Sequence, residues 1–503
     1  MEENNRPAVP NSIRSYILAV TLATFLVYFI YRRGQGRKFH YPPGPTGLPL
    51  FGSFFSLIFT KKQQHEVVND WTNKYGDVIS FKLLNIRVYV LNNVQMSHDV
   101  MGSVNMMGRM PVPIIKTLTG RENAGVALSN GDVWKEQRRF FLSVFKRADA
   151  KGIRFEEIVG AQAERMLTEI ENTQSARFDP QPIIYTSIGN IITKIVTGIT
   201  YDYDDDDFHR FMTHSNRVLD LMGPAGILAS VPILAVLPSP AKRQLTKEWD
   251  AMYDFIKKSI ASHKSEFNPN QEAADYIESY LHEIAKRTTE NNKGSFDEIN
   301  LLACSFDLIV AGLETSATSI SWSLHTLACY PEAQHRVRQE IFDVIGQERD
   351  PRFSDRHRMP IAMATIAECM RLRPAIDLHI ARVAEQDCQV GEYDIPKGSV
   401  VTTNMSHLFL SPSLWEEPLE FRPDRFLTED GQFDRKREPI FFGTGRRVCP
   451  GEQLARTEIF LFITSILQRF TLSLAEGVPK DLPCYHSITN RPDPYQIHAE
   501  KIV

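Results

Sequence analysis

The sequence predicts a mainly α-helical fold with a minor β part, preceded by one N-terminal transmembrane helix. Three observations predict this class. Apolar residues recur with helical spacing over most of residues 95–375, which indicates a body of packed amphipathic helices. Short apolar runs alternate with polar residues in 76–93 and 388–404, as strands do. One uncharged apolar run, residues 16–31, lies near the N-terminus.

The N-terminal run reads YILAVTLATFLVYFIY and is slightly shorter than the ~20 residues that usually span a bilayer, but its aromatic ends suit the two interfaces. No small-residue cleavage site follows it, which argues against a signal peptide. Instead the chain continues with Arg32, Arg33, Arg37 and Lys38. Because positive charge stays on the cytosolic side, we expect residues 1–38 to anchor a cytosolic body.

Residues 39–52 contain YPPGPTGLPLFG, whose prolines favour a stiff, extended linker. We expect the globular body to occupy residues 53–503. Within that body, the run MGPAGILASVPILAVLP at 222–238 predicts either a second membrane contact or a buried helix pair.

Composition fits a large globular core, because the 503 residues are 43% hydrophobic and 23% charged. The net charge of −4 gives no indication of nucleic-acid binding. Six cysteines are too scattered for a disulfide framework, and none forms a C-x-x-C pair typical of structural zinc. We expect every one of them except Cys449 to be a buried, inert thiol. Cytosolic thiols remain reduced, which agrees with this expectation.

In the first strand region, Asn85 separates two alternating apolar runs, which predicts a β-hairpin within 76–93. The second region, 388–404, has strand character on both sides of a Pro-Lys-Gly turn. No G-x-G-x-x-G motif follows a strand, so the chain lacks an evident nicotinamide or flavin site of its own.

A long helix is predicted from a capping box at Ser295 and Glu298 to Cys329. Its middle reads AGLETS, residues 311–316. A glycine there costs about 1 kcal/mol relative to alanine and needs a reason. One reason is a close helix crossing, with Thr315 bonding back to a carbonyl. The other is a ligand against Ala311 and the glycine, with an acid and a hydroxyl managing protons.

Two arginine-containing segments predict an ion-pair network. ECMRLRP places Glu368 and Arg371 one helical turn apart, and FRPDRF supplies Arg425 as a third member. Such pairs are common on helix surfaces, so this pattern alone indicates little about function.

The stretch FFGTGRRVCPGEQLARTEIFLF, residues 441–462, places one cysteine between a glycine-rich loop and an apolar helix. Arg446, Arg447 and the helix N-terminus near Glu452 would stabilise a Cys449 thiolate. That thiolate suits a nucleophile, a redox sensor or a metal ligand. A nucleophile needs a base, and no histidine is adjacent in sequence. A ligand of haem iron needs only an amide-rich pocket, with arginines for the propionates.

FGTGRRVCPG, residues 442–451, resembles the haem-binding signature of the cytochrome P450 monooxygenases. WKEQRR, AGLETS, ECMRLRP and FRPDRF then match further motifs in that family's order. VALSNGDVWKEQRRF and GEQLARTEIFLFITSILQRF resemble the animal microsomal branch, which metabolises drugs, steroids and fatty acids. Ser316 stands where the family usually has threonine, and residues 373–382 depart from that branch's proline pattern.

The resemblance implies a role for each matching residue. Cys449 would be the axial ligand of haem b iron, while Glu314 and Thr315 would form the catalytic acid–alcohol pair. The other haem contacts would be Trp134, Arg138, Ala311, Arg382, Phe442, Arg447 and Gly451. Glu368, Arg371 and Arg425 would form a structural triad. The substrate pocket would include Ile114, Ile115, Leu118, Val126, Val310, Leu378 and Ile488.

The implied reaction inserts one oxygen atom from O₂ into an apolar xenobiotic, steroid or fatty acid. Electrons would come from NADPH through a separate flavoprotein, NADPH–cytochrome P450 reductase, in some members with cytochrome b5. The implied location is the endoplasmic reticulum membrane. The exposed basic residues expected to meet an acidic partner are Lys135, Arg139, Lys146, Arg147, Arg435, Lys436, Arg437 and Arg446.

Two other functions remain open at this point. One is a peroxide-isomerising relative, which would need no NADPH. The other is a membrane-bound haem or sterol binder without turnover. The presence of both Glu314 and Thr315 argues against each.

Overall fold

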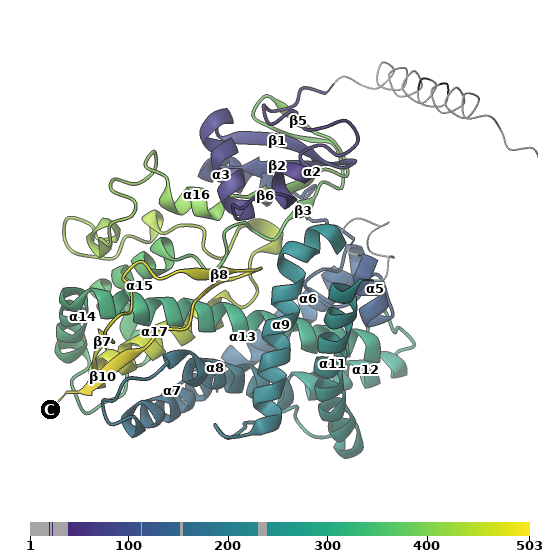
Figure 1. The fold of residues 1–503 in the computed structure, drawn as a ribbon. Helices are drawn as coiled ribbons and strands as arrows, with labels where there is room; N and C mark the ends of the chain where they lie inside the picture. The colour runs from purple at the N-terminus through teal and green to yellow at the C-terminus, as the bar shows by residue number, and fades with distance from the viewer. Residues whose placement is uncertain are drawn as a thin grey trace, which may run out of the picture.

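The computed structural model describes residues 39–111, 113–150, 154–229 and 239–502, together with residues 20 and 23. Apart from those two single positions, the predicted membrane run 16–31 lies outside the described residues. So does most of the apolar segment 222–238, of which only the start belongs to a described helix. The rest of the fold is mainly helical with small sheets, as predicted (Figure 1).

The small sheet part gathers the N-terminal segment and a distant later one (Figure 1). The predicted hairpin is confirmed as β1 (Val78–Leu83) and β2 (Ile86–Leu91), which pair antiparallel. β6 (Val400–Thr403) pairs parallel to β2, and β3 (Arg382–Val383) pairs antiparallel to β6. The helices α2 (Phe54–Ile58) and α3 (Gln64–Tyr75) lie beside this sheet.

The proline-rich segment 39–52 contains no helix and lies along the sheet. The Ser80 amide donates to the Pro43 carbonyl oxygen at 3.0 Å, and the Ser80 hydroxyl donates to Pro42 at 3.0 Å. A Cβ at Gly44 would meet the Ser80 carbonyl oxygen at 2.0 Å, so only glycine permits this approach. The extended segment is therefore held against β1.

The remaining helices surround one long central helix, α13 (Glu298–Cys329) (Figure 1). The helices before it are α4 (Val94–Gly102), α5 (Pro113–Thr119), α6 (Gly131–Ala150), α7 (Arg154–Asn172), α8 (Pro180–Thr197), α9 (Asp206–Ala229), α11 (Pro240–Glu266) and α12 (Tyr276–Thr289). Those after it are α14 (Pro331–Val344), α15 (Pro360–Leu372), α16 (Met405–Leu410) and α17 (Glu452–Arg469). Short 3₁₀ turns are η1 (Phe353–Arg358), η2 (Pro423–Phe426), η3 (Arg435–Arg437) and η4 (Gly445–Arg447).

Three two-stranded sheets complete the fold. They pair β4 (Cys388–Val390) with β5 (Tyr393–Ile395), β7 (Phe470–Leu474) with β10 (Ile497–Lys501), and β8 (Cys484–His486) with β9 (Asn490–Pro492). The strand character predicted around the Pro-Lys-Gly turn is thus confirmed in β4, β5 and β6.

α13 is the helix around which the core is built. Among the described residues it is the one helix long and apolar enough to cross a membrane, yet 72% of its apolar window is buried inside the protein. Its predicted start was wrong in detail. Asp297 is the N-cap and accepts from the Asn300 amide, while the Ser295 hydroxyl donates to Glu136 at 2.6 Å. The Gln137 side-chain amide donates to the Ser295 hydroxyl oxygen at 2.9 Å, so a tertiary partner takes the acceptor that the capping box required.

All six cysteines are free. Cys304, Cys329 and Cys369 are buried as expected, but Cys388 and Cys484 are partly exposed, so the expectation was wrong for these two. Both lie on short strands of two-stranded sheets, which leave one face in contact with solvent.

Glu368 and Arg371 form a fully buried ion pair on α15. Arg371 donates to both carboxylate oxygens, at 2.7 and 2.9 Å, and also to the carbonyls of Phe409 and Pro418. Arg425 donates to the same carboxylate at 3.1 Å. The three residues therefore tie α15 to the irregular chain between α16 and η2.

We expect Glu368→Ala to lower the free energy of unfolding by about 3–5 kcal/mol, because it leaves a buried guanidinium without its carboxylate. Urea unfolding followed by tryptophan fluorescence measures the change. Asp70→Ala is the matched control, since it breaks an exposed pair with Lys62 at 2.6 Å and should cost no more than about 1 kcal/mol. Equal losses in the two variants would contradict the role given to burial.

Candidate functional site

The loop before α17 has a backbone shape that two glycines make possible. Gly443 and Gly445 have φ of +74° and +72°, a backbone conformation that residues with a side chain rarely adopt. A Cβ at Gly443 would also lie 2.2 Å from the His379 ring, and one at Gly445 would lie 2.2 Å from the Met101 carbonyl oxygen. The Cys449 amide donates to Phe442 at 3.0 Å and closes the loop. Gly451, with φ of −95°, instead serves as the N-cap of α17.

The Cys449 sulfur is accessible although protein surrounds it. Burial raises the pKa of this thiol above its usual range. The amides of Gly451 and Glu452 and the charge of Arg138 act in the opposite direction. The amides and the arginine thus favour a thiolate but do not overcome its desolvation. A cation bound at the sulfur would complete that stabilisation.

Four arginines gather beside this loop: Arg109, Arg138, Arg382 and Arg447. Burial and their mutual repulsion lower the pKa of Arg109 and Arg447 to about 9 and that of Arg382 to about 10. Among the described residues, none of the four forms an ion pair with a carboxylate, although the charge of Glu385 opposes the lowering of the Arg447 pKa. Concentrated positive charge with so little countercharge is costly, so the cluster suits an anionic ligand.

The hydrogen-bond donors of these arginines and of Trp134 also indicate an anionic ligand. Arg138 donates to the Val448 carbonyl at 2.7 Å, and Arg447 donates to Ser129 at 2.7 Å while lying 3.9 Å from the Trp134 ring centre. The Nε of Arg382, the Nη1 of Arg447 and the Nε1 of Trp134 are buried and have no hydrogen-bond partner. Unsatisfied donors are uncommon in native proteins. Three of them around one space indicate that acceptors belong there.

The middle of α13 presents different faces to different neighbours. A Cβ at Gly312 would lie 3.0 Å from Ile192 of α8, so the close helix crossing is observed. Thr315 donates back to the Ala311 carbonyl at 2.8 Å, as the structural interpretation also expected. Yet Ala311 is exposed and Thr315 is half-buried, in a helix that is otherwise almost wholly buried. The Ala311–Thr315 face therefore borders an accessible space inside the core.

Glu314 is buried, and its contacts come from β9 and the residue before it. Its carboxylate accepts from the Thr489 hydroxyl at 3.0 Å and pairs with Arg491 at 3.4 Å. Arg491 also pairs with Asp220 of α9 at 3.1 Å. Burial raises the pKa of Glu314, and Arg491 opposes that rise. One of its oxygens, Oε2, is buried without a partner.

The candidate pocket residues fall into two groups. Ile115, Leu118, Val126 and Val310 belong to the same buried cluster, and Ile488 packs against it. Leu378 is separate, because it packs against a second cluster beside α3 and β1. The side chain of Ile114 lies outside the described residues.

Sequence reasoning did not identify Arg109, His379, Thr489 or Arg491. Arg109 lies in no recognisable motif, and Arg491 follows α13 by more than 150 residues, so no local pattern marks either. Burial and repulsion by Arg382 and Arg109 lower the pKa of His379 to about 4, which keeps its ring neutral beside the arginines.

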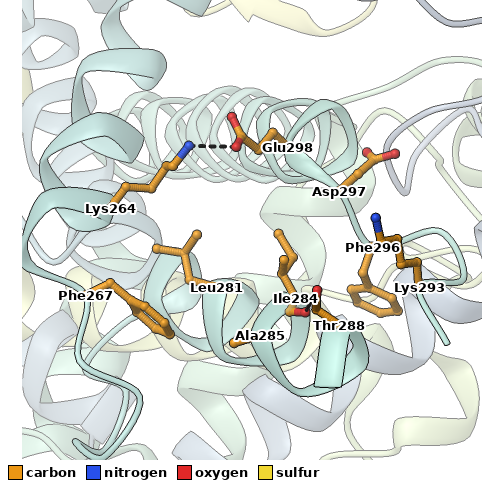
Figure 2. A pocket seen from close by; sticks show the side chains of 10 residues that line it. All are labelled: Lys264, Phe267, Leu281, Ile284, Ala285, Thr288, Lys293, Phe296, Asp297 and Glu298. Atoms are coloured by element: carbon orange, nitrogen blue, oxygen red, sulfur yellow. Dashed lines mark hydrogen bonds and ion pairs between the residues drawn. The ribbon is translucent and has the colours of Figure 1, made fainter. Parts of the chain in front are cut away.

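A separate hollow of about 380 Å³ lies between α11, α12 and the start of α13 (Figure 2). It contains none of the candidate site residues. Lys264 reaches toward it from α11 and pairs with Glu298 at 2.6 Å (Figure 2). Lys264 therefore has a carboxylate partner, unlike the arginines beside Cys449.

Ser316 links α13 to α17. Its hydroxyl donates to the Glu458 carboxylate at 2.5 Å. Glu458 is fully buried, and burial raises its pKa to about 8. The helix that carries Thr315 is thereby joined to the helix that follows Cys449.

Comparison with known proteins gives a family match that spans most of the chain. The family model described as Cytochrome P450 matches residues 42–499. Cytochrome P450 2J2 of Homo sapiens is 33% identical over 490 residues, which cover 97% of this chain and 96% of that protein. Cytochrome P450 2J5 of Mus musculus is 32% identical over 467 residues, covering 91% and 90%. Cytochrome P450 2D6 of Homo sapiens is 32% identical over 494 residues, covering 96% and 98%.

We expect Glu458→Gln to make stability less dependent on pH. The folded-state pKa of about 8 lies above that of an exposed glutamate, so the folded wild type holds an extra proton between roughly pH 4.5 and 8 and loses stability as pH rises through that window. The glutamine variant lacks this loss. Tm measured from pH 5 to 8.5 should therefore fall less steeply in the variant. Parallel curves would contradict the buried, protonated state.

Proposed function

Because the chain belongs to the cytochrome P450 family and is a monooxygenase, we propose that Cys449 is the ligand of its haem iron and that its substrate is an apolar organic molecule. Members of the family use haem with electrons from NADPH through a reductase. The observation that carries the assignment is the accessible thiol beside a cluster of arginines without carboxylate partners.

The residues present fit haem. Its two propionate carboxylates would accept from the unpartnered nitrogens of Arg382, Arg447 and Trp134. Arg138 would add charge beside the thiolate, and Arg109 is a further candidate contact. When bound, haem supplies the iron that binds and activates O₂.

Two neighbouring residues of α13 would manage protons. The Thr315 hydroxyl borders the accessible space and already holds its proton toward the Ala311 carbonyl. Glu314, whose pKa is raised by burial, would exchange a proton with groups near Thr315. Arg491 and Thr489 would keep its carboxylate in place.

We propose a xenobiotic, a steroid or a fatty acid as the substrate, since the lining candidates Ile115, Leu118, Val126 and Val310 are apolar. A methylene more or less in such a pocket changes selectivity only about 10–200-fold, so the lining alone does not name one compound. Type I spectral titration over panels of drugs, steroids and fatty acids tests the class. A selective response to sugars or nucleotides would contradict it.

We propose that residues 1–38 anchor the protein in the endoplasmic reticulum membrane, with 39–52 leading to a cytosolic haem domain at 53–503. The apolar run 16–31 and its basic flank support this topology. Phe51, Phe55 and Phe59 lie near the start of the body with exposed rings, as residues close to a membrane would. Protease treatment of sealed microsomes tests the topology, which fails if the body is protected.

The first functional prediction concerns Cys449. We expect Cys449→Ala to abolish the thiolate-type Soret band of the reduced protein under carbon monoxide, because alanine offers no ligand. Ser487→Ala is a control that leaves the band unchanged, since that serine belongs to the β8–β9 turn. Retention of the band in Cys449→Ala would exclude this cysteine as the ligand.

We propose that the electron donor docks over α6 and the cysteine loop. α6 lies against that loop, because Arg138 donates to the Val448 carbonyl at 2.7 Å. On the same helix Lys135 and Arg139 are exposed, and Arg446 is exposed on the loop. A basic surface attracts an acidic partner, with a strength that falls as salt rises.

We expect Lys135→Glu with Arg139→Glu to slow turnover supported by NADPH–cytochrome P450 reductase and to raise the apparent Km for the reductase severalfold. Peroxide-driven turnover, which needs no partner, should stay unchanged. The control is Lys257→Glu with Lys258→Glu on α11, because Lys257, like Lys135, is exposed and pairs with an aspartate three residues away. Equal slowing in both double variants would place the docking surface elsewhere.

A further inference from the structure

A second group of ligand-type side chains lies outside the cysteine site. His65 is at the start of α3, Asp377 is in the loop between α15 and β3, and His486 ends β8. Their ligand atoms all lie within 4.8 Å of one another. Three segments that are each more than 100 residues apart in sequence thus lie close together.

The spacing suits a single metal ion. The Oδ2 atom of Asp377 lies 3.1 Å from the Nδ1 atom of His65 and 3.2 Å from the Nδ1 atom of His486. Ligand atoms about 2.0–2.1 Å from a tetrahedral zinc ion are about 3.3 Å apart. The three side chains would therefore need only small movements to hold such an ion.

Burial and charge also favour binding there. The side chains of His65, Asp377 and His486 are 17%, 14% and 22% exposed, so the cluster is shielded but reachable from solvent. Among the described residues, the only ion pairs of Asp377 are with these two histidines. Burial lowers the pKa of His65, which leaves its ring in the neutral form that ligates.

His486 has competing neighbours. Its Nδ1 atom lies 3.0 Å from the Asn490 Oδ1 atom, and its Nε2 atom lies 3.1 Å from the Cys484 sulfur. Burial alone would lower the pKa of His486, but the contacts with Asp377 and Cys484 raise it to about 10. The Cys484 sulfur lies 4.0 Å from the Nδ1 atom, farther than from Nε2, so the thiol does not occupy the position between Nδ1 and Asp377.

We propose that His65, Asp377 and His486 bind one divalent transition-metal ion of the zinc class. Two imidazoles and one carboxylate favour such ions over magnesium or calcium, which prefer oxygen ligands. The bound ion ties α3 to the β8–β9 hairpin. Since Thr489 and Arg491 of this hairpin hold Glu314, the ion also steadies the contacts of that carboxylate.

The test uses the tag-free, haem-loaded full chain after dialysis against a chelator. Zinc chloride is titrated by calorimetry, and bound zinc is counted separately from iron by mass spectrometry. We expect one zinc per chain in the wild type. His65→Ala, Asp377→Asn and His486→Gln should each weaken zinc binding by at least about 10–100-fold, the loss that even an outer partner causes. Zinc should raise the Tm of the wild type and not of these variants.

The control is His335→Ala, which removes an exposed histidine on α14 and should leave zinc binding unchanged. If His486→Gln folds poorly, His65→Ala decides alone, because its ring is not part of the hairpin. Zinc binding that survives His65→Ala, or no zinc binding by the wild type, would overturn the proposal and leave a hydrogen-bonded cluster without metal. Equal affinity for magnesium would overturn the assigned class of ion.

Discussion

The buried ion pair of Glu368 and Arg371 is the interaction that holds the irregular chain before η2 against α15. The chain between α16 and η2 is irregular, so its carbonyl groups have few partners of their own. Arg371 and Arg425 donate to several of them, including those of Pro418 and Glu416. Both arginines share the Glu368 carboxylate. A buried charge is tolerated only when its partners are complete, which explains why the network is so fully bonded.

The arginines beside Cys449 show the opposite situation. They are buried together without a carboxylate, and three buried donors near them lack acceptors. Without a bound anion, the positive charges of these arginines therefore repel one another. An anionic cofactor that binds there removes the repulsion and satisfies the donors, so cofactor binding and folding stability are coupled. The unpaired arginines lower the stability of this region without a ligand, and the same charges would attract an anionic one.

α13 joins this site to the rest of the protein because each of its faces contacts a different neighbour. Gly312 permits the close approach of α8, while Ala311 and Thr315 border the accessible space. Glu314 points to Thr489 and Arg491, and Arg491 reaches Asp220 on α9. A movement of α9 or of the β8–β9 hairpin would thus be felt at Glu314. One helix thus connects Glu314 to α9 and to the β8–β9 hairpin.

The sequence by itself determined the features that depend on short spacings. The hairpin at β1 and β2, the length and burial of α13, the Glu368–Arg371 pair and the cysteine loop could all be predicted, because each follows from residues a few positions apart. Tertiary structure alone decided which distant residues meet. Arg109 joins the arginine cluster, Arg491 reaches Glu314, and His65, Asp377 and His486 converge across the whole chain. It also moved the N-cap of α13 to Asp297, because Glu136 and Gln137 bond the Ser295 hydroxyl instead. Local periodicity encodes which face of an element is apolar, but only packing determines which polar groups that face brings together.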